Sequence, residues 1–398
     1  MIIKLKRREM LFYLSYVIVY ISLFIGDVYN GGSLDTFARY LRICSYVLIF
    51  TSCINLKLKK KEIFQMIAVL MVTLLYAVKT GDLYWSILIL LIYNSKRAKI
   101  ENIYKMSLRI IVLGIISVLV LCVVGVLPDV LTSRNTVEQI NYNRHSLGFY
   151  HSNVLPLLIF YLEVYYICIT KERARNKVIV FFMSIAIVVN FFCHSRNALI
   201  LSVSLSMFIF IAKKKKKKKH AYRALYRATL FSIPCMSIFS FAMMFLLLKG
   251  GIWNTIDSFF SGRFRLAIFK MRRIGIHLIN IMSNEFFSRD NIVYVNGQDI
   301  STITLDNGYL YIILRYGILI LLFYFVIAYL LARKNKESAC VLGTLIAVFI
   351  ANFVDNDLVD YSFLPFILWA FNDWKTNRVI KNVKEKVEEI HKRKYTKI

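Results

Sequence analysis

The sequence is poor in charged residues, in proline and in paired cysteines. Of its 398 residues, 19% are charged and only 4 are proline, a composition that favours a polytopic membrane protein over a soluble enzyme. The 7 cysteines stand singly, without a CxxC pair or a regular spacing, which argues against a disulfide framework or a thiolate metal site. Acidic residues are also scarce: 23 stand against 52 basic ones, for a formal net charge of +29.

Hydrophobic residues are abundant, at 58% of the chain, and they gather in long runs. A transmembrane helix needs about 20 apolar residues. On this basis we predict an all-α, polytopic integral membrane protein with about 12 transmembrane helices. The predicted spans are 10–28, 37–56, 63–78, 82–94, 107–127, 147–169, 178–194, 196–212, 228–249, 308–331, 338–354 and 361–374.

The positive charge falls mainly in alternate loops of this arrangement. With the N-terminus in the cytoplasm, every predicted cytoplasmic segment carries several Lys or Arg residues, as the positive-inside rule requires. The run of lysines at 213–219 then anchors the chain at an anionic inner leaflet. The pattern accounts for the charge without nucleic acid and predicts that both termini are cytoplasmic.

One segment on the predicted outer side is much longer than the others. It covers 250–307, between the ninth and tenth spans, and loops of this length are usually functional or disordered. Its part SGRFRLAIFKMRRIGIHLINIM mixes apolar and basic residues at helical spacing, which is typical of a helix in the membrane interface. Residues 375–398 are predicted to form a charged cytoplasmic tail. The whole chain, 1–398, is therefore predicted to form a single polytopic membrane domain.

Arginines on the predicted outer side are the first candidates for a binding site. An arginine beside a membrane segment is kept mainly when it faces protein, water or an anion, and its planar donors suit a diphosphate. Arg196, in FFCHSRNALILS, stands between two apolar runs, so a binding role is favoured. For four others we expect contact with lipid headgroups instead: Arg39, Arg42, Arg134 and Arg289. The remaining ones are Arg144, Arg263, Arg265, Arg272, Arg273 and Arg315.

A second group of polar residues lies where the long outer segment meets the tenth span, in TLDNGYLYIILRYG. Asp306 is an acid at the membrane surface, and Asn307 and Gly308 suit a turn that enters a helix. Asp306 is either a helix cap or a general base. The residues alone do not separate these two roles.

A third group enters the sixth span from outside, in YNRHSLGFYHSNVLP. It contains Arg144, His145, His151 and Asn153. No carboxylate or cysteine stands at a useful spacing from the two histidines, so hydrogen bonding to a polar ligand or to other helices is favoured over metal binding.

The acidic motif DND at 355–357, followed by Asp360, is like that of nucleotide-sugar enzymes. The predicted topology places it outside the cell, where nucleotide sugars are absent. We therefore expect these acids to cap helices.

Four motifs give the chain a resemblance to a known family. They are RHSLGFYHSN at 144–153, SRNALILS at 195–202, SGRFRLAIFK at 261–270 and LDNGYLYIILRYGIL at 305–319. In this order along the apolar runs, they resemble the repeat-unit polymerases of O-antigen and capsule synthesis (Wzy-type), which share a superfamily with the O-antigen ligases. Each motif is short, and the resemblance extends over nearly the whole chain.

The resemblance implies a glycosyltransferase of the bacterial cytoplasmic membrane that needs no cofactor and no metal. It would transfer a growing glycan from undecaprenyl diphosphate to the next lipid-linked repeat unit at the outer face. Arg196 and Arg263 would bind the donor diphosphate, and Asp306, where the ligases have a histidine, would be the catalytic base. The secondary diphosphate contacts would be Arg144, Arg265 and Arg315, and other substrate contacts would be His145, His151, Asn153 and Asn307.

The partners implied are an undecaprenyl-diphosphate-linked oligosaccharide and membrane lipid, with a chain-length regulator and a flippase as candidates. Two other functions stay open. A flippase of the same lipid-linked oligosaccharide usually has two similar halves, whereas the candidate residues here gather on one predicted face. An O-antigen ligase, or an enzyme using a polyprenyl monophosphate sugar, is the other alternative; the latter needs acids in the first outer loop, where Asp27 and Asp35 occur.

Overall fold

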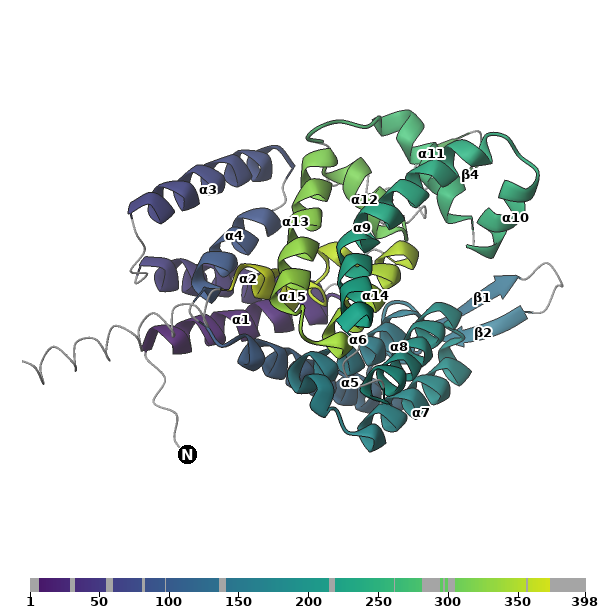
Figure 1. Cartoon of the computed structure of the whole chain (residues 1–398), viewed down its shortest axis with the longest axis horizontal. Helices are drawn as coiled ribbons and strands as arrows, with labels where there is room; N and C mark the ends of the chain where they lie inside the picture. Colours follow the sequence, from purple (N-terminus) through teal and green to yellow (C-terminus); the bar gives the residue numbers. More distant parts are fainter. Residues whose placement is uncertain are drawn as a thin grey trace, which may run out of the picture.

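The computed structural model is a helical bundle with two small hairpins (Figure 1). It describes residues 7–28, 33–54, 60–80, 83–96, 98–135, 141–214, 219–260, 262–280, 294–295, 298–299, 305–355 and 357–372. The predicted tail at 375–398 lies outside these residues, as does most of 281–304 in the long outer segment.

The helices follow the apolar runs of the sequence. In the first half they are α1 (Arg7–Ile25), α2 (Ser33–Ile54), α3 (Lys60–Thr80), α4 (Tyr84–Ser95), α5 (Ile100–Val123), α6 (Val154–Thr170), α7 (Asn176–Cys193) and α8 (Arg196–Lys214). In the second half they are α9 (Lys219–Leu247), α10 (Ile252–Phe259), α11 (Arg263–Ile274), α12 (Gly308–Arg315), α13 (Ile318–Lys334), α14 (Ala339–Val354) and α15 (Leu364–Phe371). Two short 3-10 helices are η1 (Lys171–Arg173) and η3 (Asp357–Val359).

The hairpins are both antiparallel and both lie in segments between helices. Strand β1 (Leu131–Asn135) pairs with β2 (Asn141–His145), with Leu131 opposite His145. Strand β3 (Tyr294–Val295) pairs with β4 (Gln298–Asp299). The all-α prediction therefore misses only these short elements among the described residues.

Each predicted span overlaps a described helix, which supports an all-α membrane protein. Seven helices are long and apolar enough to cross a bilayer, and three more apolar ones are shorter. The shorter ones include α4, with 12 residues, and α14, with 16. The figure of about 12 crossings stays a prediction, because these helices are shorter than the hydrocarbon thickness requires.

Helices α6 and α14 form the centre of the bundle. Almost all of α6 is buried, and α14 contacts α6, α8 and α9. In Figure 1, α1–α4 lie on one side of this centre and α5, α7 and α8 on another. A fully buried acid joins two of the inner helices: Glu163 of α6 accepts hydrogen bonds from Ser202 at 2.5 Å and from Ser206 at 2.6 Å, both on α8. These bonds satisfy a carboxyl group that would otherwise be costly away from water.

The two ends of the bundle differ in their side chains. At one end, where α7 begins and α8 ends, Lys213 contacts the side-chain oxygen of Asn176 at 2.5 Å. At the opposite end, α7 and α14 finish and α6 and α8 begin. We call this opposite end the site end, because the candidate residues of the sequence gather there.

The tenth predicted span, 308–331, is not a single helix. It divides into α12 and α13 at Gly317, which has φ 95° and ψ 177°, a conformation that glycine alone adopts readily. The chain that follows α11 runs into this break: Ile318 N–H donates to the carbonyl of His277, and Asn280 N–H donates to that of Tyr316, both at 3.1 Å. The break thus supplies backbone donors and acceptors that hold part of segment 250–307.

The helix predicted in this segment is confirmed as α11, although it ends at Ile274 rather than continuing to 282; its place in the membrane interface stays a prediction. Its apolar face packs inward through Phe264, Ala267 and Ile268. Arg265, on the other face, is 66% exposed. The amphipathic spacing is therefore real, and Gly275, with φ 74°, ends the helix.

We expect Gly317→Ala to destabilise the packing of segment 250–307 against the break between α12 and α13. The added Cβ would lie 2.6 Å from the carbonyl oxygen of Leu278 and 2.9 Å from the nitrogen of Asn280, and the backbone conformation alone costs about 1–3 kcal/mol for alanine. The thermal midpoint of the purified protein in detergent should fall. The matched control is Gly125→Ala, at φ 83° with no atom within 4 Å of the new Cβ, which should cost only about 1 kcal/mol. Equal midpoints for the two variants would refute the role of the close approach.

Candidate functional site

A cavity of about 320 Å³ opens at the site end and brings three predicted arginines together. Arg144, Arg196 and Arg263 line it, and each comes from a different one of the motifs singled out in the sequence. Asn153, also predicted, lines the same cavity. The rest of the lining is His194, Ser195, Asn197, Ile200, Leu201, Phe260, Ile350 and Val354. We call it the first cavity.

Three helices point their N-termini at the first cavity. Arg196 is the first residue of α8, Arg263 is the first residue of α11, and Asn153 directly precedes α6. Helix N-termini carry unpaired N–H groups and a partial positive charge, so they favour anions. None of these helices has an acidic residue in its first turn. The local charge at the cavity is therefore strongly positive.

The turn between α7 and α8 fixes Arg196. His194 takes a left-handed conformation, φ 48°, and its N–H donates to the carbonyl of Asn190 at 2.8 Å, which ends α7. Ser195 then accepts the N–H of Leu199 at 3.2 Å, which begins α8. Only two residues separate the helices, so the exposed Arg196 stands at the rim of the cavity.

Arg263 is held more tightly, because its side chain is only 8% exposed. Asp257 of α10 accepts the N–H of Phe264 at 3.0 Å and so caps the start of α11. The guanidinium Nη2 of Arg263 lies 3.7 Å from a carboxylate oxygen of Asp306. Its Nε and Nη1 atoms are buried without a hydrogen-bond partner among the described residues. Buried donors of a charged group are normally paired, so this arginine lacks part of its complement.

Arg144 is positioned by backbone and side-chain acceptors. Its Nε donates to the carbonyl of Cys193 at 3.1 Å, and its Nη2 contacts the side-chain oxygen of Asn153. These contacts join strand β2 to the end of α7 and the start of α6. Arg144 and Asn153 thus form one wall of the cavity rather than two independent contacts.

The predicted general base, Asp306, does not itself line the first cavity. It lies beside the cavity, 39% exposed, in its ion pair with Arg263. The adjacent Asn307 is the helix cap: its side-chain oxygen accepts the N–H groups of Tyr309 and Leu310, both at 3.1 Å. The side chain of Asn307 is 1% exposed and donates to Ser240, so its established contacts are structural. Of the two roles open for Asp306, capping thus belongs to its neighbour.

Three further predicted residues lie outside the first cavity. His145 pairs with Asp129 at 2.5 Å, and this pairing, with the N–H of Leu147, keeps the pKa of Asp129 below its usual value although burial acts to raise it. His151 accepts the N–H of Asn153 at 3.1 Å. Arg265 lies 3.7 Å from Asp257 and points away from the lining. Their contacts organise the loops around the site.

Arg315 lies in a second cavity of about 630 Å³, on the other side of the same end. Arg39 and Arg42, for which the sequence predicted contact with lipid headgroups, line this cavity as well. Asp360, expected only to cap a helix, is another lining residue. The sequence contained one indication that Arg39 and Arg42 act together: their spacing places them on one face of α2.

Sequence reasoning also missed His194, Asn197 and Asp257. No general pattern marks an asparagine as a cavity residue or an aspartate six residues before a helix as its cap; both are recognised only from their positions. Among the described residues, no group of three or more His, Cys, Asp and Glu is arranged to hold a metal ion.

Comparison with known proteins adds no relative. No protein-family model, no curated protein and no solved structure matches this chain. The fold defines an all-α protein with helices of membrane length, and its two cavities are the candidate sites.

The cap at Asn307 gives a test of how the site is held. We expect Asn307→Ala to lower the free energy of unfolding by about 1 kcal/mol or more, because two N–H groups of α12 lose their acceptor. Asn307→Ser keeps an acceptor at this position and should retain most of the stability. Thermal unfolding in detergent measures both, and an Ala variant as stable as the Ser variant would contradict the capping role.

Proposed function

We propose that the protein is a polymerase of lipid-linked oligosaccharide repeat units. In this proposal it transfers a growing glycan from undecaprenyl diphosphate to the next lipid-linked unit, at the outer face of a bacterial cytoplasmic membrane. The observation that carries the proposal is the first cavity, where Arg144, Arg196 and Arg263 converge with two donor atoms of Arg263 unpaired. An arginine cluster at three helix N-termini suits a diphosphate.

The proposed reaction balances without a cofactor. A hydroxyl oxygen of the acceptor sugar attacks the anomeric carbon of the donor glycan, and the bond from that carbon to the diphosphate oxygen breaks. The lipid diphosphate leaves with the bonding electrons, and the hydroxyl proton passes to Asp306. Arginines fixed around the leaving group stabilise the negative charge that develops on it.

The position of Asp306 supports its part in this reaction. Its carboxylate lies 3.7 Å from Arg263, a residue that also lines the first cavity. The base must reach the acceptor hydroxyl while the arginine contacts the donor phosphate. The ion pair holds Asp306 and Arg263 close enough together for these two roles. Because Asp306 is 39% exposed, an acceptor can approach it from the membrane surface.

Removal of the arginines tests the diphosphate site. In a host that lacks the gene, Arg263→Ala and Arg196→Ala should fail to restore long polymer and leave single repeat units. We expect the rate of transfer to fall about 100-fold or more for Arg263, because fixed donors to a developing anion contribute on this scale. Glycan sizing by gel measures the outcome, with membrane insertion checked by immunoblot.

Arg272→Ala is the matched control for both variants. Arg272 is an exposed arginine of α11 that lines neither cavity, so its loss should leave polymer length unchanged. Normal polymer from Arg263→Ala would overturn the proposal. Accumulation of lipid-linked units at the inner face in the gene deletion would favour a flippase instead.

Asp306→Asn tests the base. The substitution keeps the shape of the side chain but removes its basicity, so we expect the rate of polymer formation in membrane vesicles to fall about 100-fold or more. The control is Asp129→Asn, which alters an acid of the same end that pairs with His145 outside both cavities. Activity of Asp306→Asn equal to that of the control would limit Asp306 to its ion pair.

A further inference from the structure

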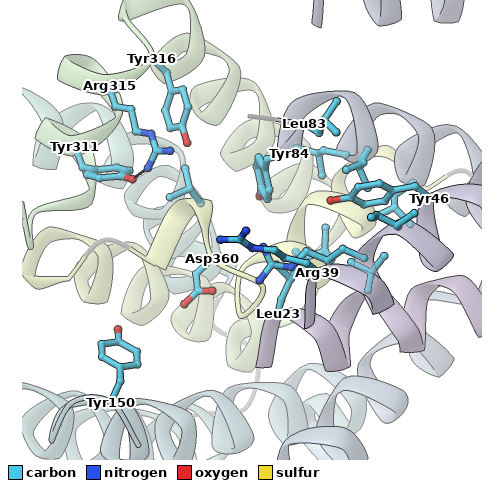
Figure 2. A pocket seen from close by; sticks show the side chains of 18 residues that line it. Leu23, Arg39, Tyr46, Leu83, Tyr84, Tyr150, Tyr311, Arg315, Tyr316 and Asp360 are labelled. Carbon is cyan, nitrogen blue, oxygen red and sulfur yellow. Dashed lines mark hydrogen bonds between the residues drawn. The ribbon is translucent and has the colours of Figure 1, made fainter. Parts of the chain in front are cut away.

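The second cavity has the size and the lining of a ligand site. Its volume of about 630 Å³ falls within the range of small-molecule pockets. Residues of α1, α2, α4 and α12 line it, together with Tyr150 before α6 and Asp360 before α15. Figure 2 shows Arg39, Tyr84, Arg315 and Tyr150 extending toward one space from four different segments.

Cations dominate the charge of this cavity. Among the described residues that line it, Arg39, Arg42 and Arg315 stand against one carboxylate, that of Asp360. The Nε atom of Arg42 is buried and has no hydrogen-bond partner among the described residues. A buried, unpaired guanidinium donor that lines a cavity indicates a missing anionic partner.

Aromatic side chains hold one of these cations in place. The guanidinium carbon of Arg315 lies 5.3 Å from the ring centre of Tyr311 and 5.1 Å from that of Tyr316. The ring of Trp85 meets Tyr316 edge-on at 5.1 Å. An arginine stacked in this way loses little side-chain freedom when it binds an anion.

Tyrosines form much of the remaining wall. Tyr46, Tyr84 and Tyr150 line the cavity in addition to the two that stack on Arg315. A tyrosine offers an apolar ring and a hydroxyl, which matches the apolar faces and hydroxyl groups of a sugar. Arginines and tyrosines together therefore suit a phosphorylated sugar better than a bare hydrocarbon chain.

The two cavities lie on either side of shared chain segments. Tyr150 lines the second cavity, and Asn153, three residues later, lines the first. Likewise Val354 lines the first cavity and Asp360 the second. We call residues 150–153, Val354 and 357–360 the ridge. Within the ridge, Tyr150 is attached to the chain after α1, because its N–H donates to the carbonyl of Asp27 at 3.2 Å.

Two separate anion sites are what the proposed reaction requires. The donor diphosphate is attached to the anomeric carbon that reacts. The acceptor hydroxyl, in contrast, lies at the non-reducing end of its repeat unit, away from the diphosphate of the same molecule. A polymerase must therefore hold two diphosphates apart while the distal sugar of the acceptor reaches the donor.

We propose that the second cavity binds the diphosphate and first sugar of the acceptor, with Arg39, Arg42 and Arg315 on the phosphates and tyrosines against the sugar. The inference deepens the proposed function and rests on it. The ridge then separates the two lipid carriers, and the acceptor glycan crosses it to reach Asp306 beside Arg263. Asp360 opposes the bound anion, so its removal should strengthen binding.

Counting bound diphosphates tests the inference. The full-length protein, in nanodiscs of zwitterionic lipid, is titrated with a short-chain polyprenyl diphosphate, and native mass spectrometry gives the number bound. We expect two per chain for the wild type and one for Arg42→Ala/Arg315→Ala, with the affinity of the lost site reduced at least about 10-fold. Arg196→Ala/Arg263→Ala should also bind one, and the combined variant none.

Substitutions that should change the affinity in opposite directions distinguish a binding role from a merely structural effect. Asp360→Asn should bind the second diphosphate more tightly, because the substitution removes a negative charge from the cavity. The local fold should be kept, because Asn still accepts the N–H of Tyr361, whose nitrogen lies 2.6 Å from the carboxylate oxygen. Arg42→Lys keeps the charge without the planar donors and should bind with intermediate affinity. Arg272→Ala is again the control and should bind two. A second site unchanged in Arg42→Ala/Arg315→Ala, or weakened in Asp360→Asn, would overturn the assignment.

Further arms separate the possible sources of the phosphate. Titration with inorganic diphosphate shows whether the phosphates alone suffice, and nanodiscs with phosphatidylglycerol show whether a lipid headgroup competes. Occupation of the second cavity by phosphatidylglycerol that excludes the polyprenyl diphosphate would overturn the acceptor assignment. A wild type that binds one diphosphate, lost in Arg196→Ala/Arg263→Ala, removes the second site but leaves the proposed function. Two bound diphosphates without polymer in the host would instead refute the proposed function.

Discussion

The arrangement at the site end depends on one constraint: a buried guanidinium group needs partners for its charge and its N–H donors. Arg263 is almost fully removed from solvent, yet its only ion pair among the described residues is with Asp306, at 3.7 Å. A charge in such surroundings is tolerated only where other groups stabilise it. The structure provides the space for that partner in the first cavity, beside two more arginines. An anion there would satisfy the donors that protein atoms leave unpaired.

The segment that contains α10 and α11 keeps this arginine in place. Asp257 caps the start of α11, and the chain after α11 bonds to the backbone at the break between α12 and α13. The same α12 begins at Gly308 and is capped by Asn307, next to Asp306, and Gly308 N–H donates to the carbonyl of Asp355 in the turn after α14. The two partners of the ion pair therefore belong to elements that are tied together by backbone hydrogen bonds. A short helix such as α11 would not be rigid without such anchors.

Hydrophobic runs allowed the helices to be predicted from the sequence, but not their interruptions. The apolar run from 308 to 331 continues through Gly317, and only the backbone contacts with His277 and Asn280 explain why the helix breaks there. The same limit applies to the site. The motifs marked Arg144, Arg196 and Arg263 individually, and their convergence depends on tertiary packing that spacing cannot reveal: α6 packs on α8, whereas α11 packs on α9 and α12. Arg39 and Arg42 line their cavity together with Arg315 and Asp360, which are distant in sequence, so spacing could not reveal this shared lining either.

The placement of Arg196 and Arg263 at the first positions of their helices is itself an argument for a bound anion. A cation at a helix N-terminus opposes the helix dipole, by about 0.3–1 kcal/mol at an exposed site. Both α8 and α11 lack an acidic residue in the first turn that would offset this repulsion. In FFCHSRNALILS, the two-residue turn leaves Arg196 no other position, since His194 caps the end of α7 and the carbonyl of Ser195 accepts the first backbone hydrogen bond of α8. At α11 the carboxylate of Asp257, which accepts the N–H of Phe264, offsets part of the conflict, whereas nothing comparable is described at α8. A ligand of negative charge in the cavity would relieve what remains at both helices.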